Sequence, residues 1–240
     1  MKKTLLLSLV ALLLSAVALV KVYAPCDTKT EAVAVDVEAV LKDHPEYVIQ
    51  ALQAYEQKAR EAAEAQLRAL VKDNEAALNA DNAPMQGNPS AKVVMVEFYD
   101  YACGYCRSLF PELSQVIAKN SDVKVLYRPL AFVSAHSEYA ARAVLAANEQ
   151  GKFSELHTAL MTVQKPLSAA LVDELAEKVG IDVEKMKADM KSDKVSAAFE
   201  NNNVLAGNIQ ISGVPSLIMN GEMVAPVANE IQAKIDAARK

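Results

Sequence analysis

The 240-residue sequence predicts an α/β domain that contains a helical insertion and is preceded by a separate helical segment. Two apolar runs, at residues 92–99 and 123–127, flank a helical stretch that begins near residue 103, and this order indicates a β-α-β unit. Helical patterns then fill residues 137–208 almost without a break. Near the C-terminus, Asn220-Gly221 separates two short apolar runs, which predicts a β-hairpin.

The composition argues against a nucleic-acid-binding protein. Asp and Glu (30) outnumber Lys and Arg (25), the net charge is −5, and no long basic run is present. Binding to phosphates requires a basic surface, which this chain does not offer. Hydrophobic residues make up 52% of the chain, enough to bury one sizeable core. We therefore expect one globular domain with an additional segment, and no nucleic-acid partner.

Residues 1–24 have the pattern of an export signal. Met1-Lys2-Lys3 supplies positive charge, and residues 5–20 are apolar. Ala16-Val17-Ala18 offers a cleavage site, and the apolar run falls short of the roughly 20 residues that span a bilayer. An uncleaved membrane anchor is the alternative. Either form places the protein in an exported, periplasm-like compartment where disulfides persist. We hypothesise that Cys26 forms a disulfide between two copies of the chain.

Residues 25–86 are expected to form an N-terminal helical segment. Residues 35–78 are rich in Ala, Glu, Gln and Leu, and their one proline, Pro45, suits a first helical turn. Apolar side chains form one stripe along the long helix, at Val48, Leu52, Tyr55, Ala59, Ala63, Leu67 and Leu70. A helix of roughly 35 residues with such a stripe is marginal alone in water. The stripe either folds back on its own domain or, as its length favours, joins copies into a dimer or trimer.

Turn-forming residues between 79 and 90 mark a boundary, and we place the globular domain at residues 87–240. Its first strand, at residues 92–99, is a continuous apolar run apart from Lys92 and Glu97, as expected for a strand covered on both faces. Within the insertion, turn signals divide the helical pattern into five helices, at 137–149, 153–161, 168–179, 183–191 and 195–205. A last helix is expected at 228–238.

Cys103 and Cys106 form a C-x-x-C pair where the first strand is expected to give way to a helix. Unpaired backbone N–H groups at a helix N-terminus favour a negatively charged sulfur. Cys103 is therefore predicted to be the nucleophile, and Cys106, one turn later, the resolving thiol. The alternatives are a disulfide that does not exchange and a pair of cysteine ligands to a metal ion. Zinc usually needs four ligands, and His44, His136 and His157 show no spacing that suggests a site, but two thiolates alone are able to hold Cu(I).

The segment from Val93 to Cys106, with an acid at Glu97 ahead of the first cysteine, resembles the active-site region of thioredoxin-fold proteins. The helical insertion and Gly213-Val214-Pro215-Ser216 before the terminal hairpin are similar to the DsbA-like family. The resemblance covers about residues 87–240. It implies a thioredoxin fold and thiol–disulfide oxidoreductase activity, with no cofactor beyond the disulfide that the two cysteines form.

By position, the resemblance makes Glu97 the buried acid that exchanges a proton with the resolving cysteine. It makes Pro215 a cis-proline facing the cysteines. The backbone of Val214 would then pair with an extended substrate beside Gly104 and Tyr105. Because such pairing recognises main chain, the implied substrates are unfolded or misfolded exported proteins.

The direction of electron flow stays open. Gly104-Tyr105 stands where strong oxidases of the family usually have Pro-His, and it is similar to disulfide isomerases of the DsbC type. An oligomerisation helix before a DsbA-like domain resembles the suppressor-of-copper-sensitivity C (ScsC) group. Val214, however, is closer to the oxidase pattern than the isomerases' usual Thr. We expect an oligomeric disulfide isomerase; the alternatives are a dithiol oxidase recycled by a membrane partner and a Cu(I)-binding protein.

Overall fold

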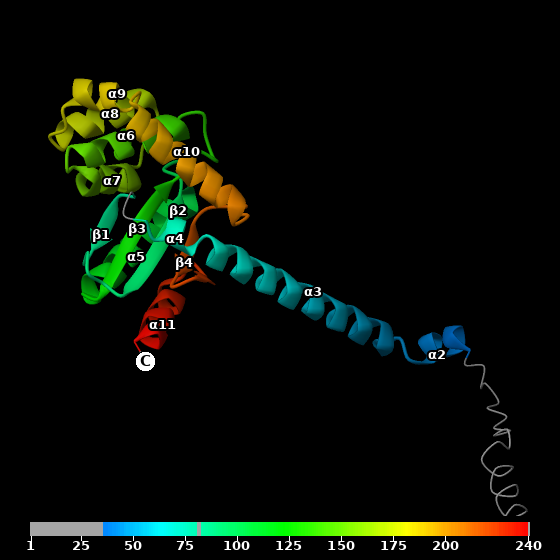
Figure 1. Cartoon of the computed structure of the whole chain (residues 1–240). Helices are drawn as coiled ribbons and strands as arrows, with labels where there is room; N and C mark the ends of the chain where they lie inside the picture. Colours follow the sequence, from blue (N-terminus) through cyan, green and yellow to red (C-terminus); the bar gives the residue numbers. More distant parts are fainter. Residues whose placement is uncertain (1–35, 81–82, 240) are drawn as a thin grey trace, which may run out of the picture. The chain divides into compact units, whose positions relative to one another are not determined.

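The computed structural model describes residues 36–80 and 83–239 (Figure 1). They belong to two compact units, one ending at Tyr55 and one beginning at Glu56. The predicted export signal and Cys26 lie outside the described residues. Within the described ranges, no helix combines the length and the apolar character needed to cross a bilayer.

The second unit is built on a five-stranded sheet of order β1-β3-β2-β4-β5. The central strands β2 (Val93–Tyr99) and β3 (Val123–Pro129) are parallel. On one side, β4 (Ser216–Met219) and β5 (Glu222–Val224) form the predicted hairpin, with β4 antiparallel to β2. On the other side, β1 (Met85–Gly87) runs antiparallel to β3. The parallel pair and the terminal hairpin give the α/β arrangement that the sequence predicts.

The sequence pattern did not predict β1, because this strand is three residues long and lies among turn formers. Its pairing with β3 depends on Gly87, whose φ is +93°. A Cβ atom there would lie 2.4 Å from the carbonyl oxygen of Val123, so only glycine allows the two backbones to approach.

Both faces of β2 are buried, as its apolar run predicts. Alternation along the strand places Glu97 and Tyr99 toward the larger core, to which α5 (Gly104–Lys119) and α11 (Ala228–Ala238) contribute buried side chains. Phe98 faces a smaller core on the opposite side. The buried members of the smaller core are Val71, Leu78, Val96, Phe98, Leu126, Leu130, Leu205, Ala206, Ile209 and Ile218.

Five helices form the insertion between β3 and β4, close to their predicted bounds. They are α6 (Ser137–Glu149), α7 (Phe153–Thr162), α8 (Ala169–Lys178), α9 (Val183–Asp189) and α10 (Asp193–Asn208). Side-chain oxygens cap the starts of three of them, at Ser168, Asp182 and Ser192. Each cap fixes the residue at which its helix begins.

The N-terminal helices are α2 (Val37–Asp43), α3 (Glu46–Asp73) and α4 (Glu75–Leu78). At 28 residues, α3 is shorter than expected. It ends where the side-chain amide of Asn74 donates to the carbonyl of Leu70 at 2.9 Å.

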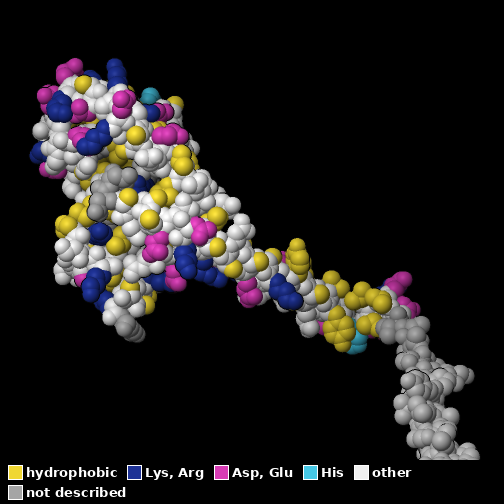
Figure 2. All heavy atoms as spheres, in the orientation of Figure 1, with side chains coloured by type: hydrophobic (Ala, Val, Ile, Leu, Met, Phe, Trp, Pro, Cys, Tyr) yellow, Lys and Arg dark blue, Asp and Glu magenta, His cyan; other side chains and the backbone are white. Residues whose placement is uncertain are grey.

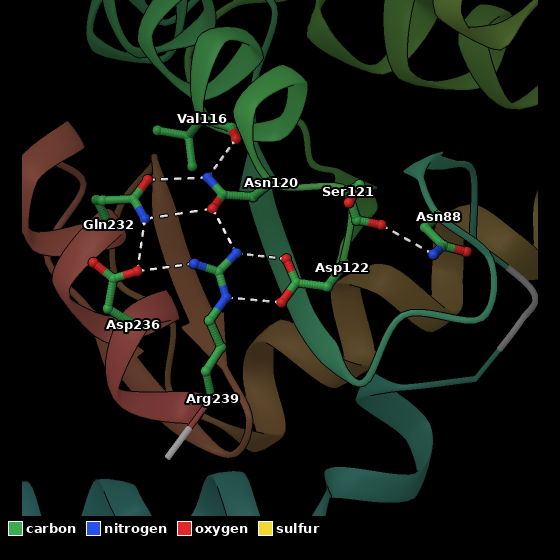
Figure 3. Close-up of polar contacts among 8 residues, drawn as sticks. All are labelled: Asn88, Val116, Asn120, Ser121, Asp122, Gln232, Asp236 and Arg239. Atoms are coloured by element: carbon green, nitrogen blue, oxygen red, sulfur yellow. Dashed lines mark hydrogen bonds and ion pairs between the residues drawn. The ribbon is translucent and has the colours of Figure 1, made fainter.

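A polar cluster fixes α11 to the start of β3 and the end of α5 (Figure 3). Arg239 forms an ion pair with Asp122 and donates to Asn120 Oδ1 at 2.7 Å. Asn120 donates to Gln232 Oε1 at 2.9 Å and to the carbonyl of Val116 at 2.7 Å. Together these contacts hold α11 beside α5, the helix that carries the cysteine pair.

Candidate functional site

The cysteine pair lies at the start of α5, directly after β2. Cys103 is the N-cap, with φ −77° and ψ 119°, and its Sγ accepts a hydrogen bond from the N–H of Cys106 at 3.4 Å. Cys103 is 6% exposed, whereas Cys106 is fully buried, and both are free thiols. Burial raises the pKa of the Cys106 thiol well above its ordinary value. Cys106 therefore keeps its proton, and Cys103 is the less buried sulfur of the two.

Glu97 lies in β2, on the face that looks toward the cysteines. Its side chain is almost completely buried, and desolvation raises its pKa to about 8. Burial is the largest cause of the raised pKa of Cys106, and the negative charge of Glu97 raises this pKa further. An acid with a pKa near neutrality beside a buried thiol is suited to exchanging a proton with it.

The loop before β4 faces the cysteine pair. The Val214–Pro215 peptide bond is cis, as the resemblance implied. The thiol of Cys103 donates to the carbonyl of Val214 at 3.4 Å, across a sequence separation of 111 residues. Gly104 is exposed, and Tyr105 is 81% exposed. The structure thus brings the predicted catalytic and substrate-binding residues into one region.

A groove with a volume of about 500 Å³ opens beside the pair. One wall is the exposed face of α5, and the other is the segment Ser212–Ser216, which includes the cis-proline. Pro226, just before α11, completes the lining. Apart from Tyr105, Val214 and Pro215, sequence reasoning named none of these groove residues as candidates.

Asp100 is a second feature that the sequence reasoning missed. Its carboxylate is fully buried and accepts four hydrogen bonds. The donors are the N–H groups of Ala102 (2.7 Å), Phe132 (2.7 Å) and Val133 (2.9 Å) and the hydroxyl of Ser137 (2.8 Å). Asp100 therefore ties the turn before the cysteines to the loop after β3 and to the start of α6. A charged residue directly after a buried strand was the available signal.

Beneath the site, buried polar rings pack against one another. Tyr99 and Tyr101 share a hydrogen bond at 2.9 Å between their hydroxyls, and Tyr101 reaches His157 Nδ1 at 3.0 Å. Burial lowers the pKa of His157 to about 3, so this ring is neutral, and it stacks on Phe153. Among the residues that the structure describes, no three His, Cys, Asp or Glu side chains are grouped to hold a metal. This histidine is part of the core.

Comparison with known proteins agrees with this geometry. The family described as DSBA-like thioredoxin domain matches residues 94–233. A thioredoxin-like oxidoreductase from Silicibacter pomeroyi DSS-3 is 34% identical, with a TM-score of 0.66 over 69% of this chain and 98% of that one. The catalytic domain of Proteus mirabilis ScsC is 26% identical, with a TM-score of 0.63 over 71% and 97%. A periplasmic thioredoxin-like protein from Salmonella enterica serovar Typhimurium is 27% identical, with a TM-score of 0.59 over 68% and 94%.

Curated relatives include much longer proteins. The Na(+)/H(+) antiporter NhaA 3 of Salinispora tropica is 28% identical over 146 residues, which are 60% of this chain and 22% of the antiporter. The chain thus spans about a fifth of the length of the first curated relatives that it matches.

Proposed function

The chain belongs to the DsbA-like family of thioredoxin-fold thiol–disulfide oxidoreductases, and from this we propose that it exchanges disulfides with exported proteins through Cys103 and Cys106. The predicted fold and family are confirmed. One observation carries the proposal: Cys103, which is 6% exposed, caps α5 beside a cis-proline loop, while Cys106 is fully buried and protonated.

The proposed exchange proceeds in two steps. The Cys103 thiolate attacks one sulfur of a substrate disulfide, which forms a mixed disulfide and releases the other substrate sulfur as a thiolate. Glu97, in its carboxylate form, then accepts the proton of Cys106. The Cys106 thiolate attacks the sulfur of Cys103, which forms the Cys103–Cys106 disulfide and releases the second substrate sulfur. The reverse sequence donates a disulfide.

The substrates that fit this site are extended chains. The backbone of Val214 lies beside the Cys103 sulfur, and Gly104 and Tyr105 are exposed next to it. Main-chain pairing at Val214 would accept many sequences, as a protein acting on unfolded or misfolded chains requires. The apolar segment after Lys3 supports export of the protein to the periplasm, cleaved or anchored.

We further propose that copies of this chain associate through α2 and α3, in a dimer or trimer. Val48, Leu52 and Tyr55 of the predicted stripe are 52%, 55% and 71% exposed. Figure 2 shows hydrophobic side chains gathered on the surface of the N-terminal helices. At i, i+4 and i+7, Val48, Leu52 and Tyr55 share one face of α3, and α2 has no buried residue. A second copy would remove this apolar surface from water.

Association would present more than one cysteine pair to a substrate, which favours shuffling of its disulfides. Reactivation of a protein with scrambled disulfides, run beside sedimentation, tests this version. Replacing Leu52 and Tyr55 by Lys should reduce both association and reactivation. The matched pair Gln50→Lys and Gln53→Lys, on polar positions of the same helix, should leave both unchanged. Reactivation by a protein that sediments as a monomer would contradict the isomerase version.

The reduction potential separates the isomerase from the alternative, a dithiol oxidase recycled by a membrane partner. A potential of about −180 mV is typical of a shuffling enzyme, and one of about −120 mV of a strong oxidase. We expect the milder value because Gly104-Tyr105 lacks the His of strong oxidases. Stoichiometric Cu(I) binding with no activity on any disulfide would contradict both versions.

A further inference from the structure

Resting on the proposed function, we propose that Glu112 gives the groove beside the cysteines a preference for substrates with Lys or Arg a few residues from the reacting cysteine. This side chain lies on α5, the helix that begins at Cys103. No sequence motif pointed to it. Its placement in the groove is the observation that carries the inference.

The groove includes Val214, the residue that contacts the reacting sulfur. Four α5 residues at helical spacings of three and four form one wall, at Tyr105, Ser108, Leu109 and Glu112. The facing wall includes Val214, whose carbonyl lies 3.4 Å from the Cys103 sulfur. An extended segment whose cysteine reacts with Cys103 would therefore continue along this groove.

Glu112 is the one acidic or basic residue among those that line the groove. The other lining groups are hydroxyls, apolar side chains and glycine. Glu112 is exposed, and it forms no hydrogen bond or ion pair through its side chain with any residue that the structure describes. In contrast, Glu138 and Glu174 on other helices already hold Arg or Lys partners. The carboxylate in the groove is therefore available to a cation of the substrate.

The distance along α5 sets the position of that cation. Glu112 lies nine positions after Cys103, which is about 13 Å at the helical rise of about 1.5 Å per residue. An extended peptide advances about 3.3 Å per residue, so about four residues cover this distance. Lys and Arg side chains are long, which widens the favoured position to about three to five residues from the substrate cysteine.

The test uses two series of peptides that carry one cysteine in a disulfide with a small reporter thiol. Each series places Lys, Gln or Glu four residues from the cysteine, on its N-terminal side or its C-terminal side. The rate constant for release of the reporter thiol is measured with the full chain. Only one of the two series places its varied residue along the groove toward Glu112. In that series, we expect the Lys peptide to react about two- to fivefold faster than the Gln peptide, the range that an exposed ion pair supports.

Glu112→Gln should abolish this preference, and Glu112→Lys should reverse it toward the Glu peptide. Concentrated salt should weaken the preference in the wild-type chain. Glu177→Gln, on α8 outside the groove, should leave it unchanged. Equal rates in both series, or a preference that persists in Glu112→Gln, would overturn the inference while the oxidoreductase function stands. If no peptide released the reporter thiol, the proposed function itself would fall, and the inference with it.

Discussion

Replacing Glu97 by Gln should stabilise the folded protein increasingly as the pH rises. Glu97 is buried in β2, and desolvation raises its pKa to about 8 from an ordinary value of 4.5. Between these two values, the unfolded chain has released the proton that the folded chain still holds. The free energy of unfolding of the wild-type chain therefore falls across this window as the pH increases, and the fall ends above pH 8.

The size of the effect follows from the two pKa values. Each pH unit between them corresponds to about 1.4 kcal/mol, so the difference between 4.5 and about 8 is on the order of 5 kcal/mol. Gln has nearly the same shape and does not ionise, so the variant lacks this contribution. Most of this amount, about 4 kcal/mol, falls between pH 5 and pH 8.5, so the stability of the variant relative to the wild type should rise by about 4 kcal/mol over that range, whatever constant offset the buried amide adds.

Urea denaturation of both proteins across this pH range, with reductant present, measures the difference. Glu177→Gln, an exposed substitution, serves as the control and should run parallel to the wild type. The same Glu97→Gln variant should release substrate more slowly from the mixed disulfide, because Cys106 has lost its proton acceptor. A stability difference that does not change with pH would refute the buried, neutral state of Glu97.

Three further stability predictions follow from the same structure, each measured by chemical denaturation. Gly87→Ala should destabilise the protein by about 1–3 kcal/mol, because φ is positive at Gly87 and a Cβ atom would meet backbone. As a control, Gly207→Ala, in open space on α10, should be neutral or stabilise the protein by up to about 1 kcal/mol; equal effects of the two substitutions would contradict the β1 pairing. Asp100→Ala should lower the free energy of unfolding by about 3–5 kcal/mol, because it leaves four hydrogen-bond donors without their acceptor. Ser137→Ala removes only one of these donors and should have an effect several times smaller; similar effects of the two substitutions would contradict the central role of the carboxylate. Val71→Ala should cost about 2 kcal/mol, since this side chain is fully buried in the smaller core, and no loss would contradict the packing of the end of α3.

Local patterns were sufficient to predict most elements of the domain. The predicted bounds of α6 and α11 agree with the structure. The apolar periodicity that marks each helix lies within the helix itself, and the turn residues that bound it lie directly beside it in the sequence. The Cys103–Cys106 pair was also predictable, since a C-x-x-C after an apolar strand is a contiguous signal. The cis bond at Pro215 followed only from the family resemblance.

Features that depend on distant segments were not predictable from one sequence. The donors to Asp100 come mainly from residues 132–137, and β1 pairs with a strand about 40 residues later. The apolar stripe of α3 has an exposed first part and a buried last part, a difference that its sequence pattern does not show. Val48, Leu52 and Tyr55 are exposed, whereas the last part of the helix, with Leu67 partly buried, packs into the smaller core. Burial of that kind is decided by tertiary packing.

The central claim is that Cys103 attacks the substrate and Cys106 releases it. Trapping of mixed disulfides tests it most directly: each single variant, Cys103→Ala and Cys106→Ala, is incubated with a protein that carries scrambled disulfides, quenched with acid, and separated on a non-reducing gel. The account predicts that Cys106→Ala accumulates covalent complexes that reductant dissolves, and that Cys103→Ala forms none. Complexes on Cys103→Ala, or their absence on Cys106→Ala, would contradict it.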